Sequence, residues 1–125
     1  MIFQAHPIGC AAAVFAFEKY DALLKDDEGR RAYWDQDLVR QTSRLEGVRS
    51  SIALGTVLAI ELEGEEGYAA TERTGALAKA LGKEGVYCRP LGNVLYFMCS
   101  PFTEKKECDD LLGILLGSIG GLLRE

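Results

Sequence analysis

The 125-residue sequence contains a single histidine, His6, and its four cysteines show no C-x-x-C spacing. Zinc sites draw their ligands from clustered cysteine and histidine, so this scarcity argues against a zinc site. One imidazole also cannot support a Ser-His-Asp or Cys-His catalytic arrangement, and a structural role is expected for it. Nothing in the cysteine pattern requires a disulfide, and free cysteines in a reducing compartment are the expectation.

No stretch approaches the roughly 20 apolar residues that a membrane-spanning helix needs. The residues Ile8-Gly9-Cys10-Ala11 are not expected to form a signal-peptide or lipoprotein site, because the apolar run follows the cysteine and no positive charge precedes it. Clustered basic residues are also missing, and the net charge is −5 with a pI near 4.9. Phosphate contacts need such clusters, so we expect neither a nucleic acid nor a membrane as partner.

What is present is an ordinary globular composition, with 48% hydrophobic and 26% charged residues, in a chain long enough for one domain. Helical periodicity predicts four helices, over 8–24, 30–45, 69–83 and 104–123. Alternating apolar residues predict two strands over 48–62, divided at Gly55. Two further runs, Val86–Arg89 and Val94–Met98, predict a β-hairpin around a Pro-Leu-Gly-Asn connector. The order α-α-β-β-α-β-β-α predicts an α+β two-layer domain.

The first predicted helix is apolar on nearly every side until Glu18. Such a helix is normally packed on more than one side. A chain this short offers it few neighbours, which indicates that the chain is part of something larger.

Several other residues are expected to have structural instead of functional roles. Trp34 is expected in the core, and Thr103 as the N-cap of the last helix. The loop around Glu63 is interpreted as solvated and metal-free, because nothing completes a coordination shell. Cys88 and Cys99 alternate into apolar strands and are expected to be buried and unreactive. The glycines of the last helix are interpreted as helix-packing positions: Gly113, Gly117, Gly120 and Gly121.

Arg89 and Tyr96 are the candidate binding residues, one on each strand of the predicted hairpin. Arg89 ends the first strand, directly before Pro90, in apolar surroundings. Its rigid fork of donors suits a carboxylate, which it can hold through two parallel hydrogen bonds. A surface arginine that caps a sheet edge fits the same pattern, so the residues alone leave both interpretations open.

The segment Arg-Pro-Leu-Gly-Asn-Val-Leu-Tyr-Phe-Met, residues 89–98, resembles the C-terminal signature of the class III pyridoxal-phosphate aminotransferases that make 7,8-diaminononanoate. Further stretches follow in the order and spacing of that family, at 5–13, 34–39 and 55–62. The Ala-His-x-x-Gly-Cys and Met-Cys-x-Pro details are most similar to the aminotransferase half of the eukaryotic bifunctional dethiobiotin synthetase/diaminononanoate aminotransferases.

This resemblance implies the C-terminal part of a fold-type-I pyridoxal-phosphate-dependent transferase, with an inter-domain helix over 1–25 and the small domain over 26–125. Arg89 matches the arginine that pairs with the substrate carboxylate, and Tyr96 matches a tyrosine of the same pocket. The resemblance assigns no catalytic, cofactor-binding or metal-binding residue to this chain. It further implies an upstream cofactor domain and a homodimer.

The implied reaction is amino transfer from S-adenosylmethionine to 8-amino-7-oxononanoate in biotin biosynthesis. The implied location is intracellular, and mitochondrial if the eukaryotic resemblance holds. Pyridoxal 5'-phosphate is the implied cofactor of the full-length enzyme. The isolated chain is not expected to bind it, because none of its six lysines stands at a family match and Ile2 replaces a phosphate-binding hydroxyl.

Two alternatives remain. The first alternative to a diaminononanoate aminotransferase is a free-standing α+β module that binds a small carboxylate without catalysis. The second is a segment of another class III aminotransferase. The latter would act on ornithine or an ω-amino acid. The spacing from Arg89 to Tyr96 favours the diaminononanoate enzymes over these other aminotransferases.

Overall fold

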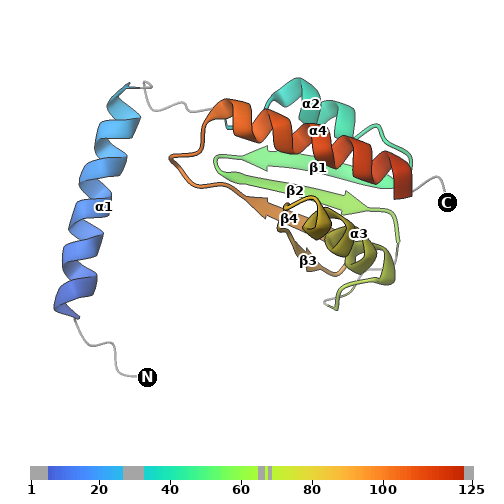
Figure 1. Cartoon of the computed structure of the whole chain (residues 1–125), viewed down its shortest axis with the longest axis horizontal. Helices are drawn as coiled ribbons and strands as arrows, with labels where there is room; N and C mark the ends of the chain where they lie inside the picture. The colour runs from blue at the N-terminus through green and yellow to red at the C-terminus, as the bar shows by residue number, and fades with distance from the viewer. Residues whose placement is uncertain (1–5, 27–32, 65–66, 68, 123–125) are drawn as a thin grey trace. The chain divides into compact units, whose positions relative to one another are not determined.

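The structure is a computed structural model that describes residues 6–26, 33–64, 67 and 69–122. The chain divides into two compact units, Met1–Arg31 and Ala32–Glu125. The first unit contains α1 (Pro7–Asp26), shown in blue in Figure 1. The second contains, in chain order, α2 (Gln36–Thr42), β1 (Val48–Leu54), β2 (Val57–Leu62), α3 (Glu72–Lys83), β3 (Arg89–Leu91), β4 (Val94–Met98) and α4 (Lys105–Leu122). The predicted element order and the α+β class are confirmed.

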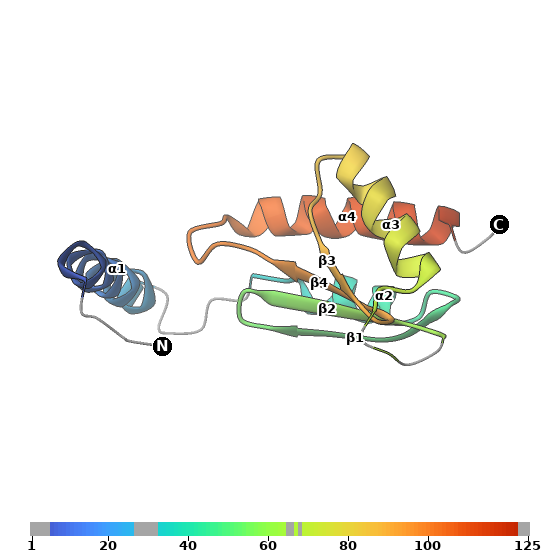
Figure 2. The same ribbon diagram turned by 90° about the horizontal axis from the view of Figure 1, so that it is seen from below.

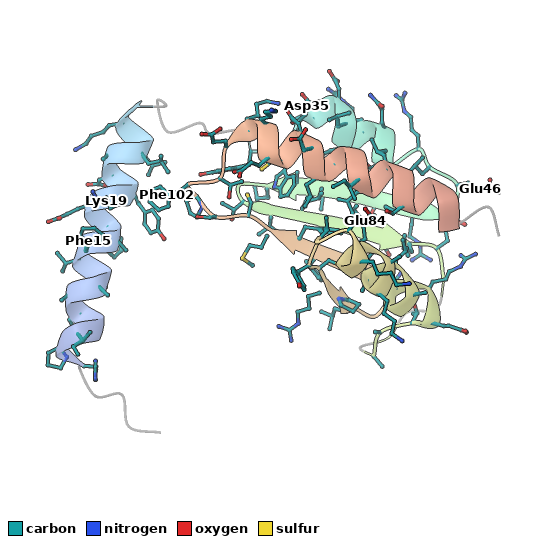
Figure 3. The ribbon with its side chains drawn as sticks, viewed as in Figure 1. Phe15, Lys19, Asp35, Glu46, Glu84 and Phe102 are labelled. Carbon is teal, nitrogen blue, oxygen red and sulfur yellow. The ribbon has the colours of Figure 1, made fainter. Side chains whose placement is uncertain are left out.

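α1 begins at Pro7, whose missing N–H costs nothing at the first helical position. His6 Nδ1 accepts a hydrogen bond from the Gly9 N–H at 3.3 Å, so the histidine has the structural role expected of it. Phe15 and Lys19 lie one turn apart, with the ammonium 5.1 Å from the ring centroid (Figure 3). The helix exposes large apolar side chains along its length: Ile8, Val14, Phe15, Phe17 and Leu24. Among the helices that the structure describes, none has the length and apolarity to cross a bilayer.

The second unit is built on a four-stranded antiparallel sheet in the order β1-β2-β4-β3. The β1–β2 connection turns at Gly55, where φ is +55°, a value that glycine adopts without strain. The β3–β4 connection turns at Gly92, where φ is +57°. Among the strands that the structure describes, β3 is therefore an edge strand that pairs with β4.

Helices cover one face of this sheet. α3 and α4 lie on the same side of it (Figure 2), and α2 packs against β1 and α4. Successive strand residues point to opposite faces, and the inward set of β2 and β4 is buried: Leu58, Ile60, Leu62, Leu95 and Phe97. α4 supplies a matching seam at helical spacing: Cys108, Leu112, Leu115 and Ile119. The opposite face, here called the outer face, exposes Ile52, Leu54, Tyr96 and Met98 within this unit.

The second helix is shorter than the prediction over 30–45, because Asp35 caps it at Gln36. The Asp35 carboxylate (Figure 3) accepts hydrogen bonds from the backbone N–H groups of Asp37 at 2.9 Å and Leu38 at 3.0 Å. The Leu38 N–H is the main cause of the lowered pKa of the Asp35 carboxyl. Trp34 precedes this helix and is buried, so its predicted core position is confirmed.

Two expectations for α4 are wrong. Thr103 does not cap the helix, because its hydroxyl oxygen accepts from the backbone N–H of Ser100 at 3.0 Å. Glu107 reaches back instead and accepts from the N–H of Glu104 at 3.0 Å, as in a capping box. A Cβ added at any glycine of α4 would meet nothing within 4 Å in the described part of the chain, so these glycines are not close-packing positions there: Gly113, Gly117, Gly120 and Gly121.

Candidate functional site

Arg89 and Tyr96 face each other across the two strands of the β3–β4 hairpin. They are register partners in the antiparallel pair. Register partners project to the same side of a sheet, so both side chains belong to the outer face. The structure thus brings together the two residues that the sequence singled out.

The strand that carries Arg89 differs from the predicted one. The prediction was Val86–Arg89, whereas β3 covers Arg89–Leu91 and has Pro90 at its centre. Proline lacks an N–H and is confined to edge strands, where one side of the strand needs no ladder. Arg89 therefore begins the strand, and the turn reduces to Gly92 and Asn93.

An apolar surface extends from Arg89 across the outer face. The register places Arg89, Tyr96, Ala59 and Ile52 in one row that crosses all four strands. Tyr96 is 38% exposed and Ile52 is 66% exposed. A guanidinium at the end of an apolar surface suits a ligand that joins a carboxylate to a hydrocarbon chain.

Charges on the outer face differ in how they are partnered. Glu61 Oε1 accepts from Arg49 Nη1 at 3.0 Å and from Asn93 Nδ2 at 3.3 Å, and Oε2 accepts from the Ser50 hydroxyl at 3.0 Å. The Ser50 hydroxyl, assisted by Asn93 and Arg49, lowers the pKa of the Glu61 carboxyl. Arg89 forms no hydrogen bond or ion pair with any residue that the structure describes.

The hairpin turn is held by residues that the sequence analysis did not identify as functional. The Gly92 carbonyl accepts from the Thr74 hydroxyl at 2.8 Å and from the Thr71 N–H at 3.2 Å. The Asn93 side-chain amide donates to the Leu62 carbonyl at 3.1 Å. The available signal was a threonine on the apolar face of the third predicted helix, since a hydroxyl at such a position needs a partner.

A pocket of about 240 Å³ is lined by neither Arg89 nor Tyr96, although Phe97 and Met98 of β4 contribute to it. It is bounded by Trp34, the end of β4 and the start of α4. The indole N–H of Trp34 is buried without an acceptor among the described residues. No group of three or more metal-ligating side chains occurs in the part of the chain that the structure describes.

The cysteines are partly as expected. Cys88 and Cys99 are half-buried instead of fully buried, and Cys108 is buried. Burial raises the pKa of the Cys88 thiol, and it is the main cause that raises the pKa of the Cys108 thiol to about 12. Both thiols therefore stay protonated near neutral pH.

No family model matches the chain. The chain is 36% identical over 115 residues to the mitochondrial bifunctional dethiobiotin synthetase/7,8-diamino-pelargonic acid aminotransferase of Oryza sativa subsp. japonica. That match covers 85% of this chain and 14% of the rice protein. An omega-aminotransferase of Caulobacter vibrioides is 29% identical over 120 residues, covering 94% of this chain and 27% of that protein.

Solved structures agree in fold. The omega-transferase of Vibrio fluvialis JS17 superposes with a TM-score of 0.77 at 16% identity, covering 99% of this chain and 31% of that one. The adenosylmethionine-8-amino-7-oxononanoate aminotransferase of Methanocaldococcus jannaschii DSM 2661 superposes with a TM-score of 0.68 at 20% identity, covering 99% and 30%. The fold is therefore that of a segment of a pyridoxal-phosphate-dependent transaminase.

The sequence relatives narrow this class. An omega-aminotransferase matches nearly the whole chain, so the segment shared with the rice protein is its aminotransferase part. The chain belongs to the family of the bifunctional dethiobiotin synthetase/7,8-diaminopelargonic acid aminotransferases, as a segment of that part. It spans about a seventh of the length of the rice protein.

Proposed function

We propose that this chain is the segment of an adenosylmethionine-8-amino-7-oxononanoate aminotransferase that binds the carboxylate of the oxononanoate substrate. On this proposal the whole enzyme transfers an amino group from S-adenosylmethionine to 8-amino-7-oxononanoate, giving 7,8-diaminononanoate in biotin biosynthesis. The names of the rice relative and of the M. jannaschii structure support this reaction. The observation that carries the binding role is Arg89, unpartnered among the described residues and opposite Tyr96 at one end of an apolar row.

Arg89 is suited to hold the distant end of a long substrate. A carboxylate bound through two parallel hydrogen bonds fixes the direction of the ligand as well as its affinity. The hydrocarbon part would then lie along Tyr96 and the outer face, which leaves the reacting carbonyl beyond this chain. Fixing a reactant in this way removes rotational freedom that the reaction would otherwise have to restrict.

The residues of this chain do not fit the cofactor by themselves. Pyridoxal phosphate supplies the chemistry of amino transfer and needs a lysine to form its Schiff base. Every lysine of the chain lies in a helix and none lies in a strand of the outer face: Lys19 and Lys25 in α1, Lys79 and Lys83 in α3, Lys105 and Lys106 in α4. None of these lysines matches the family's cofactor lysine, so on this proposal that lysine comes from a part of the enzyme outside this chain.

The proposed domain arrangement places the cofactor lysine and this chain in different parts of the enzyme. Residues 1–25 would form the helix between the domains, and 26–125 would form the small domain that closes over the cofactor-binding part. The whole enzyme would be a homodimer. The name of the rice relative supports a mitochondrial, and hence intracellular, location.

A second candidate function is a different class III amino transfer, with an ω-amino acid as substrate. The Caulobacter relative and the Vibrio structure favour it. Arg89 would then bind another carboxylate at the same place. Half-reaction rates of the full-length enzyme with 8-amino-7-oxononanoate and with an ω-amino acid separate the two functions.

Arg89→Ala in the full-length enzyme tests the binding role. We expect kcat/KM for the oxononanoate half-reaction to fall by about 30- to 1000-fold, equivalent to about 2–4 kcal/mol, because a charge-assisted pair is lost. The half-reaction with the amino donor should change by less than about twofold. Arg89→Lys should recover little, because a point charge does not reproduce two parallel hydrogen bonds. Single-turnover rates of each half-reaction provide the measurement.

Arg49→Ala is the matched control, since Arg49 is an arginine at the opposite edge of the sheet whose guanidinium pairs with Glu61. It should leave both half-reactions nearly unchanged. Equal losses in both half-reactions of Arg89→Ala would contradict the binding role and point to a general folding defect.

A further inference from the structure

A chain of hydroxyl groups ties the turn of the Arg89 hairpin to the start of α3. Thr71 is the N-cap of α3, and its hydroxyl oxygen accepts from the Thr74 N–H at 3.2 Å. The two threonine hydroxyls are 3.0 Å apart, and the Thr74 hydroxyl is 2.8 Å from the Gly92 carbonyl oxygen. The Thr74 hydroxyl has one proton and donates it to the closest acceptor, which is Gly92. Thr71 can then donate to Thr74, and such linked hydrogen bonds strengthen one another.

Gly92 lies in a confined space. The Thr71 N–H also donates to its carbonyl, so two donors from α3 and its cap meet one acceptor. On the other side, a Cβ at Gly92 would overlap the carbonyl oxygen of Gly67, and the left-handed φ of +57° disfavours any side chain. The turn is therefore hydrogen-bonded to α3 and its cap on one side and confined by Gly67 on the other.

Asn93 fixes the same turn to β2. Its side-chain amide donates to the Leu62 carbonyl at 3.1 Å and to Glu61 Oε1 at 3.3 Å. Its backbone carbonyl accepts from the Leu62 N–H at 2.8 Å. The turn is thus held from two directions by groups outside the hairpin.

Arg89 depends on this turn because β3 is only three residues long and, among the described strands, pairs with β4 alone. At about 3.3 Å per residue, Arg89 lies about 10 Å along the strand from Gly92. A strand this short has few ladder bonds to hold its own position. A displacement at the turn is therefore passed on to Arg89.

We propose that Thr74 is a positioning residue for the Arg89 site. Its buried hydroxyl holds the Gly92 carbonyl, which fixes the turn and sets Arg89 opposite Tyr96 on the outer face. The inference rests on the proposed function, because its effect is measured through the carboxylate substrate. A misplacement of about 1 Å in a binding group can cost as much as about 100-fold in rate.

Thr74→Val in the full-length enzyme tests this role, since valine keeps the shape of threonine and removes the hydroxyl. We expect kcat/KM for the oxononanoate half-reaction to fall about 10-fold, chiefly through a higher KM, with the amino-donor half-reaction unchanged. Thr74→Ser retains the hydroxyl and should restore the ratio of the two half-reactions. If the valine variant does not fold, Thr74→Ala removes the same hydroxyl without adding volume and replaces it.

Thr42→Val is the matched control. Thr42 is also fully buried, and its hydroxyl donates to the Leu38 carbonyl at 2.9 Å. It lies in α2, which packs on β1 at the opposite edge of the sheet. Both valine variants should lower the melting temperature, but only Thr74→Val should change the ratio of the half-reactions.

Two failures are distinguishable when Arg89→Ala is measured in parallel. If Arg89→Ala is selective for the oxononanoate half-reaction and Thr74→Val behaves like Thr42→Val, the positioning role is overturned and the proposed function stands. If Arg89→Ala is itself unselective, the proposed function is overturned and the positioning role with it.

Discussion

On the outer face, one carboxylate has three donors around it and one guanidinium has no partner among the described residues. Both oxygens of the Glu61 carboxylate accept hydrogen bonds from these neighbours, which lower the pKa of the Glu61 carboxyl. Arg89 lies opposite Tyr96 in the strand register, at one end of an apolar row. Because Glu61 has hydrogen-bond partners on this face and Arg89 has none among the described residues, Arg89 is the candidate residue for binding the substrate carboxylate.

Residue-scale reactivity gives a first prediction, which concerns Cys10 and Cys108. The thiolate is the reactive form of cysteine, and burial raises the pKa of Cys108 to about 12. Cys10 is exposed in α1. With iodoacetamide at about pH 8, Cys10 of the native 125-residue chain should be alkylated well before Cys108, as measured by mass spectrometry of the two peptides.

In denaturant, where burial is lost, the two cysteines should react at similar rates. Equal rates in the native chain would contradict the burial of Cys108 on the sheet-facing side of α4.

Elements of this protein are positioned by single polar groups at their ends. Asp35 sets the first residue of α2, Glu107 reaches back to the start of α4, and Thr71 caps α3. Each cap satisfies N–H groups that the helix itself leaves without partners. The capping residue of α3, Thr71, also binds the turn of the Arg89 hairpin, because its backbone N–H donates to the Gly92 carbonyl. One cap thereby couples a helix to a candidate binding site.

α1 carries the prediction at this scale. Its exposed apolar side chains include Phe15 and Phe17, and exposed apolar patches above a few hundred Å² usually mark an interface. The isolated 125-residue chain should therefore bind a hydrophobic dye and self-associate at high concentration, as measured by fluorescence and light scattering. Phe17→Ser should reduce both signals.

Phe102→Ser provides the comparison, because Phe102 is an exposed phenylalanine outside α1. It should leave the dye signal nearly unchanged. A chain that stays monodisperse without binding dye would show that the apolar side of α1 is not an interface.

For the whole molecule, the folded small unit lacks a cofactor lysine on the face that carries Arg89. We expect the isolated chain not to form a Schiff base with pyridoxal phosphate, because none of its six lysines stands at a position that matches the family's cofactor lysine. Absorbance spectra after addition of the cofactor, followed by borohydride reduction and peptide mapping, provide the measurement. Reduction that attaches the cofactor to one specific lysine would refute this expectation, whereas scattered labelling at low occupancy would not.

The sequence by itself determined the element order, the α+β class and the family. These properties depend on local information: apolar periodicity distinguishes helix from strand, and turn residues such as Gly55 and Gly92 mark the hairpins. The segment 89–98 is specific enough to indicate the family, which the relatives confirm. It also singled out Arg89 and Tyr96, although their role in binding stays a prediction.

Only the tertiary structure decided how that candidate site is built. In the structure Arg89 begins a strand, whereas the sequence predicted that it ends one. The Thr103 hydroxyl accepts from the Ser100 N–H in a loop and does not cap a helix. One face of the sheet is exposed within its unit. The bond from Thr74 to Gly92 joins residues 18 apart in sequence, and the bond from Asn93 to Leu62 joins residues 31 apart. Local patterns do not encode such partners, because a buried hydroxyl or amide bonds to whatever acceptor the packed chain brings within reach.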